Sequence, residues 1–166
     1  MSIWRRLALI SIPCAGFLAA PLARGSADAE LQLQLATLLF EDTRFQEAAV
    51  AYRNALASDD PAKQLRARIG LVTSQLRLGE FVAAQSDAKN LRQLAPKSPE
   101  AITSYADALW AAGQFDDGEA AWRDALALAP ESSRGLHGLA RALSSRSSVS
   151  GKDSKMAAKL DLICLK

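Results

Sequence analysis

The sequence predicts an all-α fold, a solenoid of three helix–turn–helix units followed by a C-terminal capping helix. Two observations lead to this prediction. The chain has 166 residues, of which 49% are hydrophobic and only 6% aromatic, and such an alanine- and leucine-rich composition favours helices around a buried core. A ladder of glycine, aromatic, small and proline positions also recurs at a constant offset along the chain, which indicates a stack of similar units.

Residues 1–27 have the three-part pattern of a secretory signal peptide. MSIWRR supplies a short positive start, LALISIPCAGFLAA a continuous apolar run, and PLARGSA an exit with small side chains. The apolar run is shorter than the ~20 residues needed to cross a bilayer, and it contains Pro13. We therefore expect cleavage after Ala27 and a periplasmic or secreted location. The alternative is an uncleaved N-terminal anchor, which is the only contact with a membrane that we expect.

The basic balance of the whole chain, a formal charge of +2, depends on its two ends. Residues 28–132 contain 10 basic and 16 acidic side chains, whereas residues 133–166 contain 7 basic and 2 acidic ones. A folded body of this sign argues against a nucleic-acid partner, because binding to phosphates needs a basic face. The two cysteines, Cys14 and Cys164, have neither a metal-binding nor a disulfide spacing.

The repeated ladder is clearest before two prolines. The residues 17, 15, 12, 8 and 5 positions before Pro130 are Gly113, Phe115, Gly118, Trp122 and Ala125. The same positions before Pro96 hold Gly79, Phe81, Ala84, Ala88 and Leu91. A less regular third copy consists of Phe45, Ala48, Tyr52 and Ala55, with Thr43 in place of the glycine and Pro61 one position late. Agreement at so many spacings indicates an internal repeat.

This pattern resembles the tetratricopeptide repeat, a helix–turn–helix unit with a period of about 34 residues. The resemblance implies a right-handed solenoid over residues 28–146 that is built from the units 29–62, 65–98 and 99–132. The sequence departs from the family pattern at the fourth position of each first helix, where the usual large aromatic is replaced by Gln32, Arg68 and Ile102. We expect this departure to affect the stability of single repeats rather than the fold.

Each position of the ladder has a predicted role in packing. Gly79 and Gly113 end the first helix of a pair, because glycine adopts the left-handed conformation at little cost. The small residues Ala48, Ala84 and Gly118 allow the two helices of a pair to cross closely. The aromatic residues Tyr52 and Trp122 fill the space between successive repeats. Proline after the second helix stops it, since proline has no backbone N–H to donate.

The end of the chain continues this pattern only in part. Residues 133–146 are predicted to form a capping helix, with Leu136, Leu139, Ala140 and Leu143 at its apolar positions. Residues 147–166 are predicted to be a flexible serine-rich tail with a short amphipathic helix, whose apolar face is formed by Met156, Ala157, Leu160, Ile163 and Cys164. This helix either replaces the missing partner of the capping helix or is a frayed end.

The resemblance also implies where a partner binds. In tetratricopeptide repeats the first helices line a concave groove, mainly with positions 2, 5, 9, 12 and 13, and the groove commonly holds a peptide. Position 12 forms an apolar column of Phe40, Leu76 and Trp110, and position 9 carries Thr37, Thr73, Asp107 and Arg141. Aromatic anchors of this kind supply much of the binding energy at protein interfaces. The alternative is that the column packs into the core.

Arginines flank the predicted groove and are candidates for binding a carboxylate. Arginine pairs with carboxylates through two hydrogen bonds, so a cationic rim would favour an acidic peptide. The candidates are Arg66, Arg77, Arg134 and Arg141. The alternative is that they are ordinary solvated arginines on the surface.

The sequence offers little for catalysis, so we expect the protein not to be an enzyme. His137 has neither a cysteine nor a GxSxG serine near it, and no phosphate-binding glycine loop is present. The acidic pairs Asp59-Asp60 and Asp116-Asp117 stand at turns before helices, where carboxylates cap backbone N–H groups, and we expect capping rather than metal binding. We therefore expect no metal, no cofactor and no small-molecule substrate.

The sequence thus favours a non-catalytic adaptor of the bacterial envelope that binds a partner protein or peptide in its concave groove. One alternative is the N-terminal repeat arm, or a truncated relative, of a larger envelope enzyme such as a protease. Another is a self-assembling protein, in which the open ends of solenoids stack on one another.

Overall fold

The computed structural model describes residues 22–147, with side chains from residue 28 to residue 146. This part of the chain forms seven α-helices and no strand. The helices are α1 (Leu22–Glu41), α2 (Phe45–Ala55), α3 (Pro61–Leu78), α4 (Phe81–Leu94), α5 (Pro99–Ala111), α6 (Phe115–Leu128) and α7 (Ser133–Ser147). The predicted all-α fold is confirmed.

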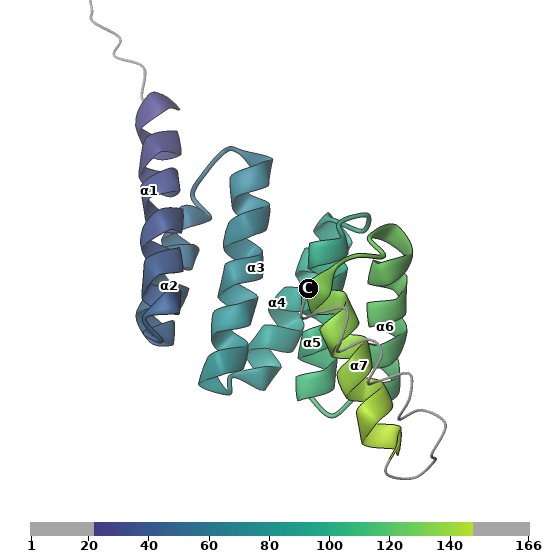
Figure 1. Ribbon diagram of the computed structural model, residues 1–166. Coiled ribbons are helices and arrows are strands. Elements are labelled where there is room, and N and C mark those ends of the chain that lie inside the picture. Colours follow the sequence, from purple (N-terminus) through teal and green to yellow (C-terminus); the bar gives the residue numbers. More distant parts are fainter. Residues whose placement is uncertain (1–21, 148–166) are drawn as a thin grey trace, which may run out of the picture.

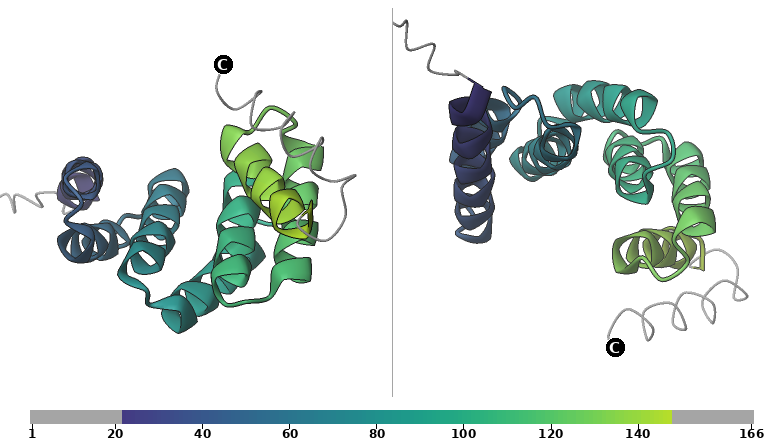
Figure 2. Two further views of the ribbon diagram at one scale, coloured as in Figure 1. Left: turned by 60° about the horizontal axis from the view of Figure 1, so that its bottom comes forward. Right: turned by 90° about the horizontal axis from the view of Figure 1, so that it is seen from above.

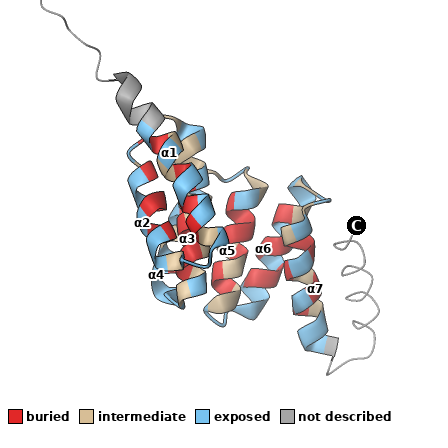
Figure 3. Cartoon of the chain, turned by 60° about the vertical axis from the view of Figure 1, so that its left-hand side comes forward, coloured by how far each residue is buried: buried red, intermediate tan, exposed pale blue. Residues whose placement is uncertain are grey.

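The helices stack as successive antiparallel pairs along a curved path (Figure 1). Each helix packs on the next one in sequence, and α1, α3, α5 and α7 also contact one another in turn. These odd-numbered helices form the inner row of an arc, and the even-numbered helices form the outer row (Figure 2). The buried residues face one another between the helices, so the core consists of three clusters that follow one another along the stack rather than of a central ball (Figure 3).

The turns inside the pairs have the predicted geometry. Gly79 and Gly113 adopt positive φ angles of 77° and 81° after α3 and α5, which confirms their predicted role. The first pair has no glycine at this point, and Thr43 takes the left-handed conformation with a φ of 62°. Side chains other than glycine are strained there, because their Cβ approaches the backbone. The prolines also act as predicted, since α4 and α6 end two residues before Pro96 and Pro130.

Two helices that begin a repeat, α3 and α5, have a proline in their first turn and a capping side chain just before it. The carboxylate of Asp60 accepts a hydrogen bond of 2.8 Å from the backbone N–H of Ala62, and Ser98 caps α5 in the same way. The capping expected of Asp60 is therefore confirmed. The expectation for the second acidic pair is wrong, because Asp116 and Asp117 lie inside the first turn of α6 and the N-cap residue of that helix is Gln114. Their charges still favour the positive end of the helix dipole.

Small and large side chains complement one another between the helices. Ala48, Ala84 and Gly118 are buried at the crossings within the pairs, and a Cβ on Gly118 would lie 3.2 Å from the carbonyl oxygen of Ala106. Trp122 is fully buried and packs beneath Gly138 of α7. Small residues thus allow the close approach that the sequence predicted.

The structure leaves open the predictions that concern the two ends of the chain. Most of the expected signal peptide, residues 1–27, lies outside the described residues, and the expected cleavage point after Ala27 falls within the range of α1. The predicted tail, residues 147–166, lies outside the described residues except for Ser147, which ends α7, and so does the amphipathic helix predicted within it. Within residues 22–147, none of the helices has the length and apolar character needed to span a membrane.

Candidate functional site: the concave groove

The inner row of helices forms two adjoining hollows. The first, of about 280 Å³, lies between α1 and α3 and is lined by Leu33, Thr37, Phe40, Tyr52, Arg66, Ile69, Gly70 and Thr73. The second, of about 500 Å³, lies between α3, α5 and α7 and is lined by Thr73, Leu76, Arg77, Asp107, Trp110, Ala111, Arg134, His137, Gly138 and Arg141. Thr73 of α3 borders both hollows, so the two form one groove.

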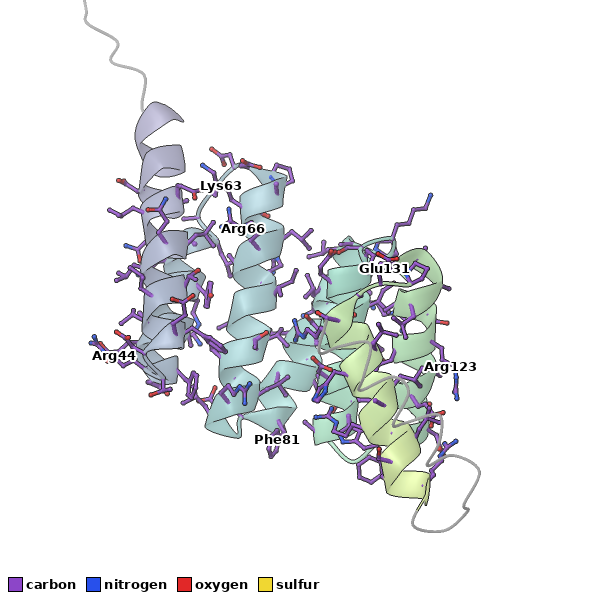
Figure 4. All side chains as sticks on the ribbon, viewed as in Figure 1. Arg44, Lys63, Arg66, Phe81, Arg123 and Glu131 are labelled. Atoms are coloured by element: carbon purple, nitrogen blue, oxygen red, sulfur yellow. The ribbon has the colours of Figure 1, made fainter. Side chains whose placement is uncertain are left out.

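The first hollow is mainly apolar. Its floor is the ring of Tyr52, which lies against Gly70 so closely that a Cβ at Gly70 would be 2.6 Å from Cδ1 of the ring. The Thr37 hydroxyl donates a hydrogen bond of 2.9 Å to its own helix, at the carbonyl of Leu33, so its methyl group is available to the hollow. Arg66, near the start of α3, lies 3.8 Å from the Glu30 carboxylate at the rim (Figure 4).

The second hollow is organised by one carboxylate. Asp107 accepts hydrogen bonds of 2.9 Å from the indole Nε1 of Trp122 and 2.9 Å from Nε of Arg134. Arg134 also extends its guanidinium to the Thr73 hydroxyl, at 3.4 Å. Asp107 and Arg134 therefore neutralise each other and connect α5 with α7, α6 and α3. We conclude that these two predicted site residues have a structural role in the wall of the groove.

Two other arginines of the second hollow have no such partner. The guanidinium carbon of Arg141 lies 5.3 Å and 5.2 Å from the ring centroids of Trp110 and Trp122, a cation–π arrangement that leaves its N–H donors unused. Among the described side chains, neither Arg141 nor Arg77 has a carboxylate within ion-pair distance. The exposed side chain of His137 lies in the same hollow. The second hollow therefore carries uncompensated positive charge.

The apolar column is divided between the core and the groove. Phe40, Leu76 and Trp110 are each half-buried. The ring centroids of Phe40 and Phe45 are 5.1 Å apart, and those of Trp110 and Phe115 are 4.7 Å apart. Each of the three also borders one of the hollows. The two interpretations of the column are thus both partly correct, since one edge of each side chain packs inside and the other faces the groove.

The structure brings all ten predicted site residues to this groove, although their contact with a partner remains a prediction. Sequence reasoning missed other residues that also line it, and three of these share one position of the repeat. Leu33, Ile69 and His137 occupy position 5 of the first, second and fourth units. This position belongs to the groove-lining set of the resemblance, so the signal was present in the spacing.

The described residues contain no cluster suited to a metal ion. Nowhere between residues 22 and 147 do three His, Cys, Asp or Glu side chains come together. The buried carboxylate of Glu119 is paired with Arg123 on its own helix and, at 2.8 Å, with Arg146 of α7. Its position indicates that it fixes α7 to α6.

Comparison with known proteins supports the predicted resemblance. A family model described as tetratricopeptide repeat matches residues 99–142, which include α5, α6 and most of α7. Similar solved structures cover most of the remaining chain. The fold is a tetratricopeptide-repeat solenoid. No curated protein matches the sequence.

Structures of MamA are among the similar solved structures. The structure "MamA 41-end from Desulfovibrio magneticus RS-1" is 19% identical, covers 83% of this chain and 74% of its own, and has a TM-score of 0.60. "MamA MSR-1 C2" is 18% identical over 81% of this chain and 77% of its own, with a TM-score of 0.58. At these identities the likeness concerns the fold.

Proposed function

We propose that this tetratricopeptide-repeat solenoid is a non-catalytic adaptor of the bacterial envelope, which holds a peptide of a partner protein in its concave groove. The peptide places an apolar side chain in the first hollow and a carboxylate in the second. The fold supports the first part of this proposal, because such solenoids bury their own apolar faces by stacking and leave the inner row of helices to other proteins.

The observation that carries the proposal is the contrast between the two adjoining hollows. The first is apolar and bordered by Phe40 and Ile69, whereas the second holds the guanidinium groups of Arg77 and Arg141, which have no carboxylate partner among the described side chains. Arginine binds carboxylates with two parallel hydrogen bonds, and Trp110 and Trp122 hold the guanidinium group of Arg141 in place. The groove therefore favours an extended peptide with apolar and acidic residues.

The proposed location rests on the signal-peptide pattern of residues 1–27. It is tested by expressing the full-length sequence, fractionating the cells and determining the N-terminus of the purified protein by mass spectrometry. A periplasmic protein that begins at Asp28 is expected. A protein that keeps Met1 and stays in the cytoplasm would refute this part of the proposal.

The binding role is tested by capture of partners from envelope extract with the purified protein. Thr37→Arg fills the first hollow, and Arg77→Glu reverses a charge in the second; both sites are exposed on helices and outside the core. Matched controls are Gln34→Arg, on the same helix as Thr37 but away from the hollow, and Lys97→Glu, in an exposed turn.

We expect one partner to be retained by the original protein and by both controls, and to be lost with either groove variant. Circular dichroism confirms first that all variants keep their helicity. Retention of the same proteins by all five forms, or by none, would refute binding in the groove.

A further inference from the structure

The outward side of α1 carries an apolar stripe that nothing in the described chain covers. Leu31, Leu35 and Leu38 are 63%, 42% and 61% exposed. They lie at i, i+4 and i+7, so they share one face, and this face is turned away from the groove-lining residues of the same helix.

The equivalent face is buried in the next repeat. On α3 the matching residues are Ala67, Leu71 and Ser74, which are all buried, and α3 packs there against the preceding helix α2. The stripe on α1 therefore lies where the stack would receive one more helix, which would run antiparallel to α1 as the other neighbours do.

The charges beside the stripe indicate what kind of helix fits. Asp28 lies three residues before Leu31 and Asp42 four residues after Leu38, so the two acids bracket the stripe on the same face. Residues 28–43 contain four acidic side chains and no basic one. If two copies paired α1 with α1 in an antiparallel way, Asp28 of each would meet Asp42 of the other, and like charges would oppose the contact. The occupant must therefore be apolar and basic.

The C-terminal segment, residues 152–166, has this composition in the matching order. Its apolar positions Met156, Leu160 and Ile163 span the same seven residues as the stripe, so that in an antiparallel pair the outer two lie opposite Leu38 and Leu31 and Leu160 lies within one position of Leu35. Lys152 precedes Met156 by four residues and Lys166 follows Ile163 by three, so the bracketing charges have the same separation along both partners. In an antiparallel pair, Lys152 is opposite Asp42 and Lys166 is opposite Asp28.

The remaining charges of this segment agree with the pairing. Four lysines stand against the two acids Asp153 and Asp161, so the segment is basic as a whole. Its opposite charge to α1 favours the association of the two faces.

The geometry of the solenoid places this contact between two molecules rather than within one. The helices α1 and α7 lie at opposite ends of the arc (Figure 2), and the link from Ser147 to Lys152 spans at most about 18 Å. In addition, α7 exposes no large hydrophobic side chain among its described residues, whereas α1 exposes three. The apolar surface that needs a cover is thus on α1.

We propose that residues 152–166 of one copy dock as an antiparallel helix on the Leu31-Leu35-Leu38 stripe of a second copy. The contact joins the C-terminal end of one solenoid to the N-terminal end of the next. Such a head-to-tail interface is heterologous, so it repeats into chains or rings rather than stopping at a dimer. It uses a different face from the peptide groove, and the two functions are independent.

The first test measures binding of a fluorescein-labelled peptide of residues 152–166 to the purified protein by fluorescence anisotropy. The protein is expressed from its full-length sequence and used at low concentration. We expect saturable binding that is weakened at least tenfold by Leu35→Glu, because a carboxylate enters the centre of the apolar contact. The matched control Val82→Glu, at a side chain that is 85% exposed on α4, leaves the affinity unchanged.

The second test checks the register by exchanging charges. Asp42→Lys weakens binding about two- to fivefold, as expected for an exposed ion pair, and a peptide with Lys152→Asp restores it. Analytical ultracentrifugation then follows the mass of the full chain with concentration. We expect the mass to rise beyond that of a dimer, and to stay that of one copy in the Leu35→Glu and Leu160→Glu variants. The mass of one copy at all concentrations, or growth that Leu35→Glu leaves intact, would overturn the proposal.

Discussion

The contact between Trp122 and Gly138 gives a sharp test of how the last repeat is packed. Trp122 is fully buried, and its indole Nε1 is fixed by the hydrogen bond to Asp107. A Cβ added to Gly138 would lie 2.5 Å from that nitrogen. The change Gly138→Ala therefore forces either the indole or α7 to move. Neither moves easily, since the indole is fully buried and hydrogen-bonded to Asp107, and α7 is tied to α6 through Arg146.

The magnitude follows from two opposing effects. Alanine in place of glycine stabilises a helix interior by about 1 kcal/mol. Overpacking of a filled core costs typically about 1–3 kcal/mol, and this overlap is with a rigid ring. Because the ring is rigid, the overpacking cost is expected in the upper part of this range, about 2–3 kcal/mol, so Gly138→Ala lowers the free energy of unfolding by about 1–2 kcal/mol. At roughly 4 °C per kcal/mol, the melting temperature falls by about 4–8 °C.

The control is Gly135→Ala, three residues earlier on the same helix. A Cβ there would lie 3.0 Å from Cδ2 of Leu126, the flexible end of a side chain, so the gain in helix propensity remains. Urea unfolding followed by circular dichroism measures both variants. The reasoning is refuted if the two changes alter stability equally, or if Trp122→Phe leaves the cost of Gly138→Ala unchanged in a double-mutant cycle.

Two further predictions concern the ends of helices, and thermal unfolding measures both. Thr43→Gly raises the free energy of unfolding by about 1 kcal/mol, because it removes a Cβ from a residue with a φ of 62°. Gly79→Ala lowers the free energy of unfolding by a similar amount, because it adds a Cβ at a positive φ. A loss of stability in Thr43→Gly would contradict this account. Asp60→Ala lowers the free energy of unfolding by about 1 kcal/mol through the loss of the cap on Ala62, and the adjacent Asp59→Ala serves as the control that has little effect.

The scaffold could be predicted from the sequence because its determinants are local. Gly79 ends a helix and Pro96 stops the next one through their own backbone chemistry, so their spacing is visible in the sequence. The exception is also local in origin. Asp116 and Asp117 looked like caps, but the turn at Gly113 starts α6 earlier than a cap at Asp116 requires.

The state of the groove could be predicted only in part, because it depends on contacts between distant residues. The spacing placed Asp107 and Arg134 on the concave side, yet nothing local indicates that these two residues, on α5 and α7, neutralise each other. Arg141 received the same expectation as Arg134. Its surroundings differ from those of Arg134 because its guanidinium group lies over the ring of Trp110. Predicting this contact requires knowing how α7 packs across α5.

The interfaces between repeats differ in how they are packed. At the first and last interfaces, an aromatic side chain on the second helix of one repeat contacts a glycine on the first helix of the next repeat. These pairs are Tyr52 with Gly70 and Trp122 with Gly138. The equivalent positions of the middle interface hold Ala88 and Ser104. This interface thus lacks an aromatic side chain there, and its buried hydrophobic cluster consists of Val72, Ala88 and Ala108.

The second hollow spans this middle interface, since its walls come from α3 on one side and from α5 and α7 on the other. The proposed peptide would contact both halves of the solenoid across an interface whose buried hydrophobic cluster is small. Binding must therefore stabilise the stack as well as fill the groove, because a ligand that requires both halves in register favours the folded arrangement.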